Sequence, residues 1–165
     1  MRKHRLPNLL SARRRYFSRN KIPPTISMDE THHVLFDGTP CYEKRWRHVQ
    51  SYHSTPEFVA AVVDNSGEAF HIDVSGIAIY DMRFKRTFGF YANLAAVSNG
   101  PSEAFHITLD GQPAYDQLHA WCGNFSTLPV NHLGSSAQAP VRDIDGRYFH
   151  INELGQILGG PYRYC

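Results

Sequence analysis

The sequence predicts an all-β fold built from tandem repeats of about 35 residues, each supplying short antiparallel strands. Two observations lead to this expectation. The stretches AFHIDVSG (69–76) and AFHITLDG (104–111) are nearly identical and begin 35 residues apart. Within both stretches apolar and polar residues alternate with the period of two that is typical of a strand. We therefore expect a hairpin array over residues 31–165, either solenoid-like or open-propeller-like.

Histidines mark the same position in successive repeats. The spacings between them are 38, 35 and 44 residues, and a glycine follows each one five residues later. The histidines and glycines are His33, His71, His106 and His150, and Gly38, Gly76, Gly111 and Gly155. The first three repeats also place a tyrosine nine residues after the histidine, namely Tyr42, Tyr80 and Tyr115. An acid, Glu43, Asp81 or Asp116, comes next. The pattern gives about three and a half repeats.

Each repeat reads as a hairpin followed by a further strand. The apolar triplets AAV (60–62), AAV (95–97) and APV (139–141) precede the histidine strands, and turn-forming residues lie between. The glycine five residues after the histidine is expected at a sharp turn with positive φ. A third strand is expected within 77–80 and 113–115. The histidine is expected on the polar face of a half-buried strand, hydrogen-bonded to a neighbouring turn or strand.

One such repeat is too small to bury its own apolar face, so neighbouring repeats must stack. The fourth repeat ends in its middle without a visible polar cap. The sequence therefore predicts either a part of a longer array or a homo-oligomer in which another copy covers the end.

Residues 1–30 are predicted to be a separate basic arm with a proline linker. Residues 1–21 contain eight Lys or Arg and no acid, whereas residues 22–165 contain nine Lys or Arg against fifteen acids, a net charge of 9 − 15 = −6. A helix from Asn8 to about Asn20 fits the pattern, and Pro23-Pro24 would end it. The candidate contacts to phosphates or another anionic surface are Arg13, Arg14, Arg15, Arg19 and Lys21.

Four interpretations of the arm stay open: a solvated tail, a targeting segment, a nucleic-acid contact and a membrane-surface contact. The chain contains no apolar run of roughly twenty residues, so no transmembrane segment is predicted. Three distant cysteines without a C-x-x-C pair indicate free thiols in a reducing compartment. The predicted location is the cytoplasm. The alternative is the mitochondrion, since residues 15–18 (RYFS) look like a presequence cleavage site.

The unit F-H-I-x-x-x-G-x-x-x-Y-D, followed by G-x-F and A-A-V, resembles the WG-repeat (KWG-type) proteins, which are common in bacteria. Gly89-Phe90 and Gly123 with Phe125 lie in the Gly-x-Phe region, and the resemblance covers about residues 31–165. Phe-His or His-His replaces the Trp-Gly dipeptide, which suggests a divergent branch. The resemblance implies an all-β interaction module without catalytic residues.

The sequence predicts no enzyme, no cofactor and no metal site. A position that recurs once in every repeat is usually required by the fold, whereas a catalytic site needs a single asymmetric constellation. A ladder of metal-binding histidines is the competing interpretation. DIDG (143–146) is interpreted as a hairpin turn because charged calcium ligands are missing around it. The predicted function is a non-catalytic module for protein–protein interaction; the alternative is a nucleic-acid-binding accessory protein acting through the basic arm.

Overall fold

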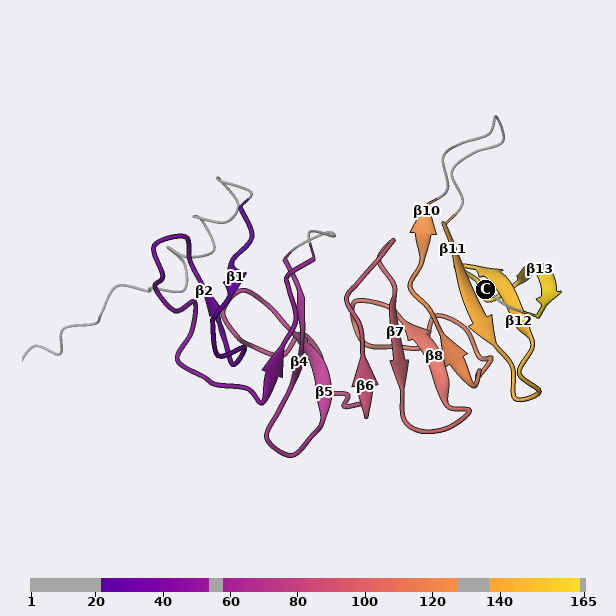
Figure 1. Ribbon diagram of the computed structural model, residues 1–165, viewed down its shortest axis with the longest axis horizontal. Helices are drawn as coiled ribbons and strands as arrows, with labels where there is room; N and C mark the ends of the chain where they lie inside the picture. The colour runs from indigo at the N-terminus through magenta and orange to yellow at the C-terminus, as the bar shows by residue number, and fades with distance from the viewer. Residues whose placement is uncertain (1–21, 54–57, 128–136, 164–165) are drawn as a thin grey trace, which may run out of the picture.

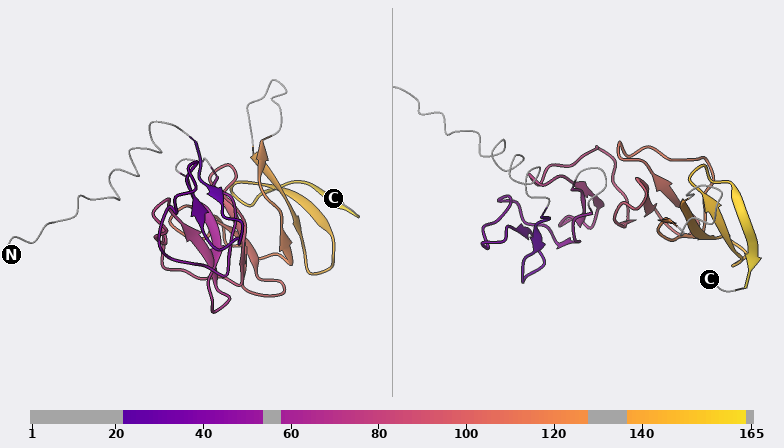
Figure 2. Two further views of the ribbon diagram at one scale, coloured as in Figure 1. Left: turned by 60° about the vertical axis from the view of Figure 1, so that its left-hand side comes forward. Right: turned by 90° about the horizontal axis from the view of Figure 1, so that it is seen from above.

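The fold is all-β over the part of the chain that can be described. The computed structural model describes residues 22–53, 58–127 and 137–163, and these residues contain no helix. The small antiparallel sheets follow one another along the long axis of the molecule (Figure 1). The view from above gives the same order (Figure 2). The expected helix between Asn8 and Asn20 and the five basic contact residues of the arm lie outside the described residues.

The described strands form four sheets. The first pairs β1 (Thr25–Ile26) with β2 (His33–Val34). The second contains β3 (His48–Val49), β4 (Ala60–Val63) and β5 (Ala69–Ile72), and the third contains β6 (Arg86–Thr87), β7 (Ala95–Ser98) and β8 (Ala104–Ile107). The last contains β9 (Trp121–Cys122), β10 (Ser126–Thr127), β11 (Ala137–Arg142), β12 (Tyr148–Asn152) and β13 (Ile157–Tyr162).

The predicted hairpins are present, and their registers match. Ala61 pairs with His71 in the β4–β5 hairpin, and Ala96 pairs with His106 in the β7–β8 hairpin. In the β11–β12 hairpin, Pro140 occupies the corresponding position opposite His150. The glycines five residues after the histidines have φ between 74° and 81°, as the sequence predicts for a turn that L side chains rarely adopt.

The third strand predicted after each histidine forms as a continuous strand only after β12. Ile72 pairs with Ala78, and Ile107 pairs with Pro113, through isolated bridges only. After β12, by contrast, the chain continues as the six-residue strand β13. The difference arises because the segment that follows Ala78 crosses back to the start of β5, where Phe84 pairs with Ala69, and then enters β6.

The prediction of half-buried strands is wrong for β5 and β8. All four residues of β5 are buried, and β8 has a single partly exposed residue, Phe105. Since His71 and His106 are 0% exposed, the face that the sequence marked as polar is covered as well. Aromatic side chains from later in the chain cover this face, which is why the histidines of β5 and β8 are fully buried. Only β12 resembles the prediction, because His150 is partly exposed.

Tyrosine rings pack against the turn glycines of the segment that follows. A Cβ atom added at Gly76, Gly111 or Gly155 would lie 2.6–2.7 Å from Cγ of Tyr42, Tyr80 or Tyr115, respectively. Such a distance is far inside van der Waals contact, so only a residue without a side chain fits beneath the ring. Gly38, at the first of these turns, has no atom within 4 Å of the same position. Glycine therefore serves both backbone conformation and packing at three of the four turns.

Gly111→Ala and Gly38→Ala form a matched pair because their φ angles are +80° and +81°. Gly38→Ala should cost only the backbone strain, roughly 1 kcal/mol. Gly111→Ala should cost the same strain plus about 1–3 kcal/mol for displacing the Tyr80 ring. Chemical denaturation of both variants measures the difference in unfolding free energy. Equal losses would show that the tyrosine ring does not constrain the turn.

Candidate functional site

Three buried histidines form the same hydrogen-bond network. Nδ1 contacts the hydroxyl of the tyrosine nine residues later, at 2.6 Å for His33–Tyr42 and 2.5 Å for His106–Tyr115. His71 and Tyr80 make the same contact. Nε2 contacts a backbone carbonyl seventeen residues after the histidine, at 2.7–2.8 Å; these carbonyls belong to Gln50, Phe88 and Gly123. Each imidazole therefore connects three separate segments of the chain.

The partners determine where the proton of each imidazole lies. A carbonyl oxygen can only accept, so Nε2 carries the hydrogen and donates it. Nδ1 is then an acceptor, and the tyrosine hydroxyl donates to it. Both ring nitrogens of His33, His71 and His106 are thus used by the fold, and the neutral imidazole fits these partners without any unsatisfied group.

Burial keeps these imidazoles neutral. It lowers the pKa of His33, His71 and His106 to about 4 from the ordinary value of 6.5. The bonds from Nε2 to the carbonyls oppose the shift but are outweighed by desolvation. The same burial raises the pKa of the tyrosine hydroxyls above its usual range, so they remain protonated donors.

An aromatic ring nineteen residues after each of the three buried histidines packs against its imidazole. The ring centroids lie 4.2 Å apart for His33–Tyr52, 4.5 Å for His71–Phe90 and 4.6 Å for His106–Phe125. The sequence analysis noted Phe90 and Phe125 but did not place them against the histidines. Their constant offset of nineteen residues was the available signal.

His150 does not reproduce this arrangement. Residue 159, nine positions later, is Gly159 rather than tyrosine, and the imidazole of His150 is partly exposed. Its described ring contact is with Tyr162, at 5.5 Å between centroids. The equivalence of the fourth histidine therefore extends to its strand register and not to its side-chain partners.

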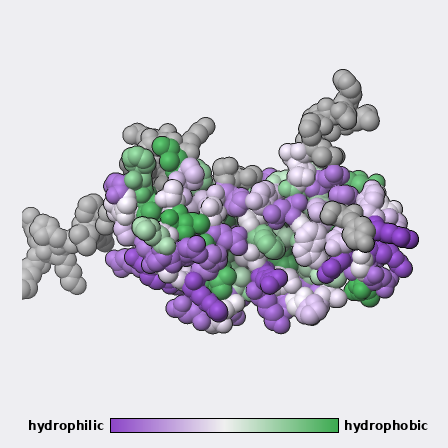
Figure 3. Space-filling model, in the orientation of Figure 1, coloured by the Kyte–Doolittle hydropathy of each residue, from purple (hydrophilic) through white to green (hydrophobic). Residues whose placement is uncertain are grey.

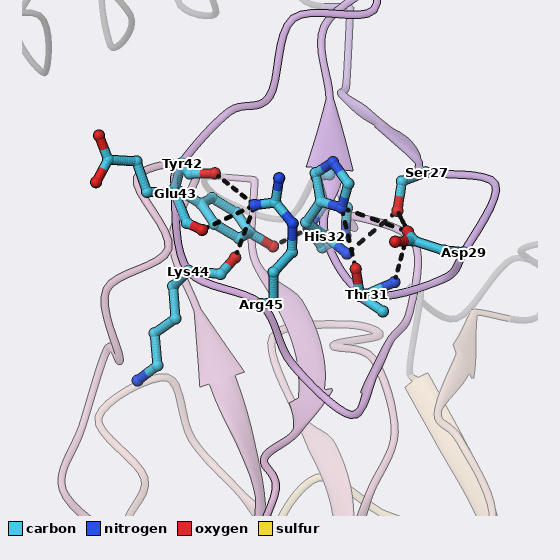
Figure 4. A network of polar contacts seen from close by, with 9 residues as sticks. Ser27, Asp29, Thr31, His32, Tyr42, Glu43, Lys44 and Arg45 are labelled. Carbon is cyan, nitrogen blue, oxygen red and sulfur yellow. Dashed lines mark hydrogen bonds and ion pairs between the residues drawn. The ribbon is translucent and has the colours of Figure 1, made fainter.

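Two arginines that the sequence analysis did not single out hold the turns after the tyrosines. Nη1 of Arg45 donates to the carbonyls of residues 42–44, at 3.3, 2.8 and 3.3 Å (Figure 4). Nη1 of Arg83 donates to the carbonyls of residues 80–82, at 2.9–3.2 Å. The acidic residues that follow the tyrosines, Glu43, Asp81 and Asp116, are exposed. An arginine twelve residues after the histidine was the available signal, although Leu118 stands at that distance from His106.

The described residues offer no cluster of ligands for a metal ion, and the thiol of Cys122 is not activated. Among them, no group of three or more His, Cys, Asp or Glu could hold a metal ion. Cys41 and Cys122 are buried, and burial raises the pKa of the Cys122 thiol to about 12, which disfavours its reactive thiolate. The network of buried histidines has the geometry of a structural element.

The surface also has a groove that is lined by basic and aromatic residues, unlike the buried histidine networks. It has a volume of about 410 Å³ and lies where β6 and β7 meet β9 and the end of β11. Its lining includes the basic residues Lys85, Arg86 and Arg142 and the aromatic residues Phe88 and Trp121. No motif in the sequence predicted this groove.

Comparisons with protein-family models and with curated proteins found no match to this chain. The resemblance to WG-repeat proteins therefore stays a prediction. No helix in the described residues is long and apolar enough to cross a membrane.

Tyr80→Phe should destabilise the protein by about 1–3 kcal/mol, because Nδ1 of His71 would lose its donor while remaining buried. The matched control is Tyr91→Phe, since Tyr91 is partly exposed and its hydroxyl lies outside the histidine networks. Urea denaturation of both variants checks the prediction. A loss for Tyr80→Phe no larger than that for Tyr91→Phe would contradict the importance of the contact.

Stability should fall as the pH drops from about 6.5 to about 4. Over this range the unfolded chain takes up protons on His33, His71 and His106, whereas the folded chain leaves them neutral. The unfolded state binds more protons, so the free energy of unfolding decreases by up to about 1.4 kcal/mol per pH unit for each histidine. Denaturation midpoints between pH 8 and pH 4 measure the effect. A constant midpoint from pH 7 to pH 5 is incompatible with buried neutral imidazoles.

Proposed function

We propose that residues 31–165 form an open array of β repeats that acts as a non-catalytic protein-interaction module related to WG-repeat proteins. The observation that carries this proposal is the recurrence of one complete network, from the histidine to the tyrosine, the distant carbonyl and the covering aromatic ring. A network repeated with unchanged partners serves the same structural purpose each time.

The network supports a structural role for the histidines rather than a catalytic or metal-binding role. A general base needs a free nitrogen within reach of a substrate, and a metal ligand needs a free lone pair. In His71 and His106 both nitrogens are hydrogen-bonded and the side chains are 0% exposed. The function is therefore assigned to the surface that the array presents.

Exposed apolar side chains support an interaction role. Met28 and Phe36 are exposed beside β1 and β2, and Ile157 and Leu158 are exposed on β13, an edge strand of the last sheet. The space-filling view shows apolar residues gathered on the N-terminal part of the visible face, with hydrophilic residues over much of the rest (Figure 3). Apolar side chains at both ends of the row of sheets are typical of surfaces that contact another protein or another copy.

The second candidate function is nucleic-acid binding through the basic arm. Its support is the charge of residues 1–21, which contain eight Lys or Arg and no acid. Binding to phosphates would release counterions and weaken steeply with added salt. The proposed location of the protein in the bacterial cytoplasm is compatible with both candidates.

Affinity capture with two baits, both comprising residues 1–165, separates these candidates. One bait is the natural chain, and the other has Arg13, Arg14 and Arg15 replaced by glutamine. The interaction module predicts that the same discrete protein is recovered by both baits, with and without nuclease treatment. Recovery that needs the arginines and disappears after nuclease would transfer the function to the arm.

His71→Asn tests the assignment of the histidines. The fold should lose several kcal/mol of stability, because asparagine cannot reach both Tyr80 and the carbonyl of Phe88. His48→Asn is the control, since its side chain is about half exposed (48%). Thermal unfolding measures both. Unchanged stability in His71→Asn would contradict the structural assignment and reopen a chemical role for this residue.

A further inference from the structure

The groove beside β6 joins residues that are far apart in the sequence. β6 and β7 pair so that Arg86 lies opposite Ser98, and β9 and β11 pair so that Arg142 lies opposite Trp121. Small buried residues, including Ala96 and Ala104, also line the space of about 410 Å³. A volume of this size lies within the range of ordinary ligand sites and accommodates a few side chains.

Three cations line this groove without a carboxylate partner. Among the described residues, Lys85, Arg86 and Arg142 form no ion pair, whereas Arg147, nearby in sequence, contacts Asp145 at 3.2 Å. A carboxylate oxygen of Glu103 and the ammonium group of Lys85 both lie within 4 Å of the position that a Cβ atom would take at Gly100, but the two groups form no ion pair. Cations that share a groove repel one another, so a bound anionic group would be favoured there.

Aromatic rings form the sides of the same groove. Phe88 is 41% exposed and Trp121 is 40% exposed. The ring of Trp121 is held at its edge by Tyr148, with the centroids 6.3 Å apart. The guanidinium of Arg142 lies 5.9 Å from the centre of the same tyrosine ring. Partly exposed aromatic rings next to arginine are typical of the residues that contribute most to protein binding.

The equivalent position beside the β4–β5 hairpin lacks the two adjacent unpaired cations. Arg47 donates its backbone N–H to Val63 just as Lys85 donates to Ser98, at 2.9 and 3.0 Å. Next to Arg47 stands His48, which contacts the carboxylate of Glu30 at 3.5 Å. The groove is therefore a local feature of the region from β6 to β11, and Arg47 supplies a matched control for Lys85.

We propose that this groove binds a short acidic segment of a partner protein, with carboxylates on Lys85, Arg86 and Arg142 and an apolar side chain between Phe88 and Trp121. The proposal rests on the proposed function, because it names the chemistry by which the interaction module recognises its partner. Charge complementarity to the three unpaired cations fixes the acidic character, and the two aromatic rings fix the apolar character.

A short acidic peptide fits this groove better than a nucleic acid. Residues 22–165 carry a net charge of 9 − 15 = −6, so the cations form a small positive site on a negative body. A long polyanion that entered the groove would continue onto surface of its own sign, whereas a segment with two or three carboxylates ends within the positive site. The basic arm of the same chain has the wrong charge to be the occupant.

Fluorescence anisotropy with the protein of residues 1–165 tests the proposal. The probe is a labelled short peptide of alternating glutamate and phenylalanine, and its control has glutamine in place of every glutamate. The glutamate peptide should bind, and Lys85→Glu should weaken it by about tenfold or more, whereas Arg47→Glu should leave it within about twofold. Trp121→Ala should also weaken binding. Thermal unfolding verifies that each variant is folded.

Several results would overturn the proposal. They are equal binding of the two peptides, equal losses for Lys85→Glu and Arg47→Glu, or displacement of the peptide by an oligothymidylate that binds more tightly and needs Lys85.

The proposed function is tested separately by the captured partner protein. If capture survives Lys85→Glu together with Arg86→Glu, and the peptide does not bind, the groove proposal fails while the interaction module stands. If the peptide binds through Lys85 but no partner protein is captured, the result supports acidic-peptide binding in the groove and contradicts the proposed interaction function.

Discussion

The structure depends on a buried imidazole that must keep both nitrogens hydrogen-bonded. In His71 the donor Nε2–H needs the carbonyl of Phe88, and the acceptor Nδ1 needs the hydroxyl of Tyr80. Losing either partner would leave a buried polar group at a cost of about 1–3 kcal/mol. The strand, the turn that carries the tyrosine and the start of the next sheet are therefore specified together. Strands of two to four residues, which would be weak alone, become parts of one cooperative structure.

The tyrosines extend this constraint from one segment to the next. The hydroxyl of Tyr80 donates to His71, while its ring lies on Gly111 in the following turn. One side chain thus holds its own segment and positions its successor, which couples neighbouring hairpins. The first turn glycine, Gly38, carries no such ring, and the fourth histidine is followed by Gly159 where a tyrosine would stand. Coupling between nearest neighbours of this kind is how repeat arrays gain stability.

Much of the hairpin pattern could be predicted from the sequence, because strand period and turn residues are local properties. The β4–β5 and β7–β8 hairpins follow directly from residues 60–72 and 95–107. The burial of His71 could not be predicted from the same window, since Tyr80 and Phe90 cover it from later in the chain. The groove could not be predicted from the sequence either. Arg86 and Arg142 meet there only because two separate strand pairings place them on the same surface.

The neutral histidine networks separate the stability of the scaffold from the electrostatics of its surface. With a pKa of about 4, His106 adds no charge beside the groove near neutral pH. The histidines of the unfolded chain nevertheless begin to take up protons near pH 6.5, well above the ordinary pKa of a glutamate at about 4.3. Mild acid therefore weakens the scaffold before it neutralises the carboxylates of an acidic partner. A loss of binding at pH 5 that is accompanied by unfolding would therefore reflect the scaffold and not a loss of charge complementarity in the groove.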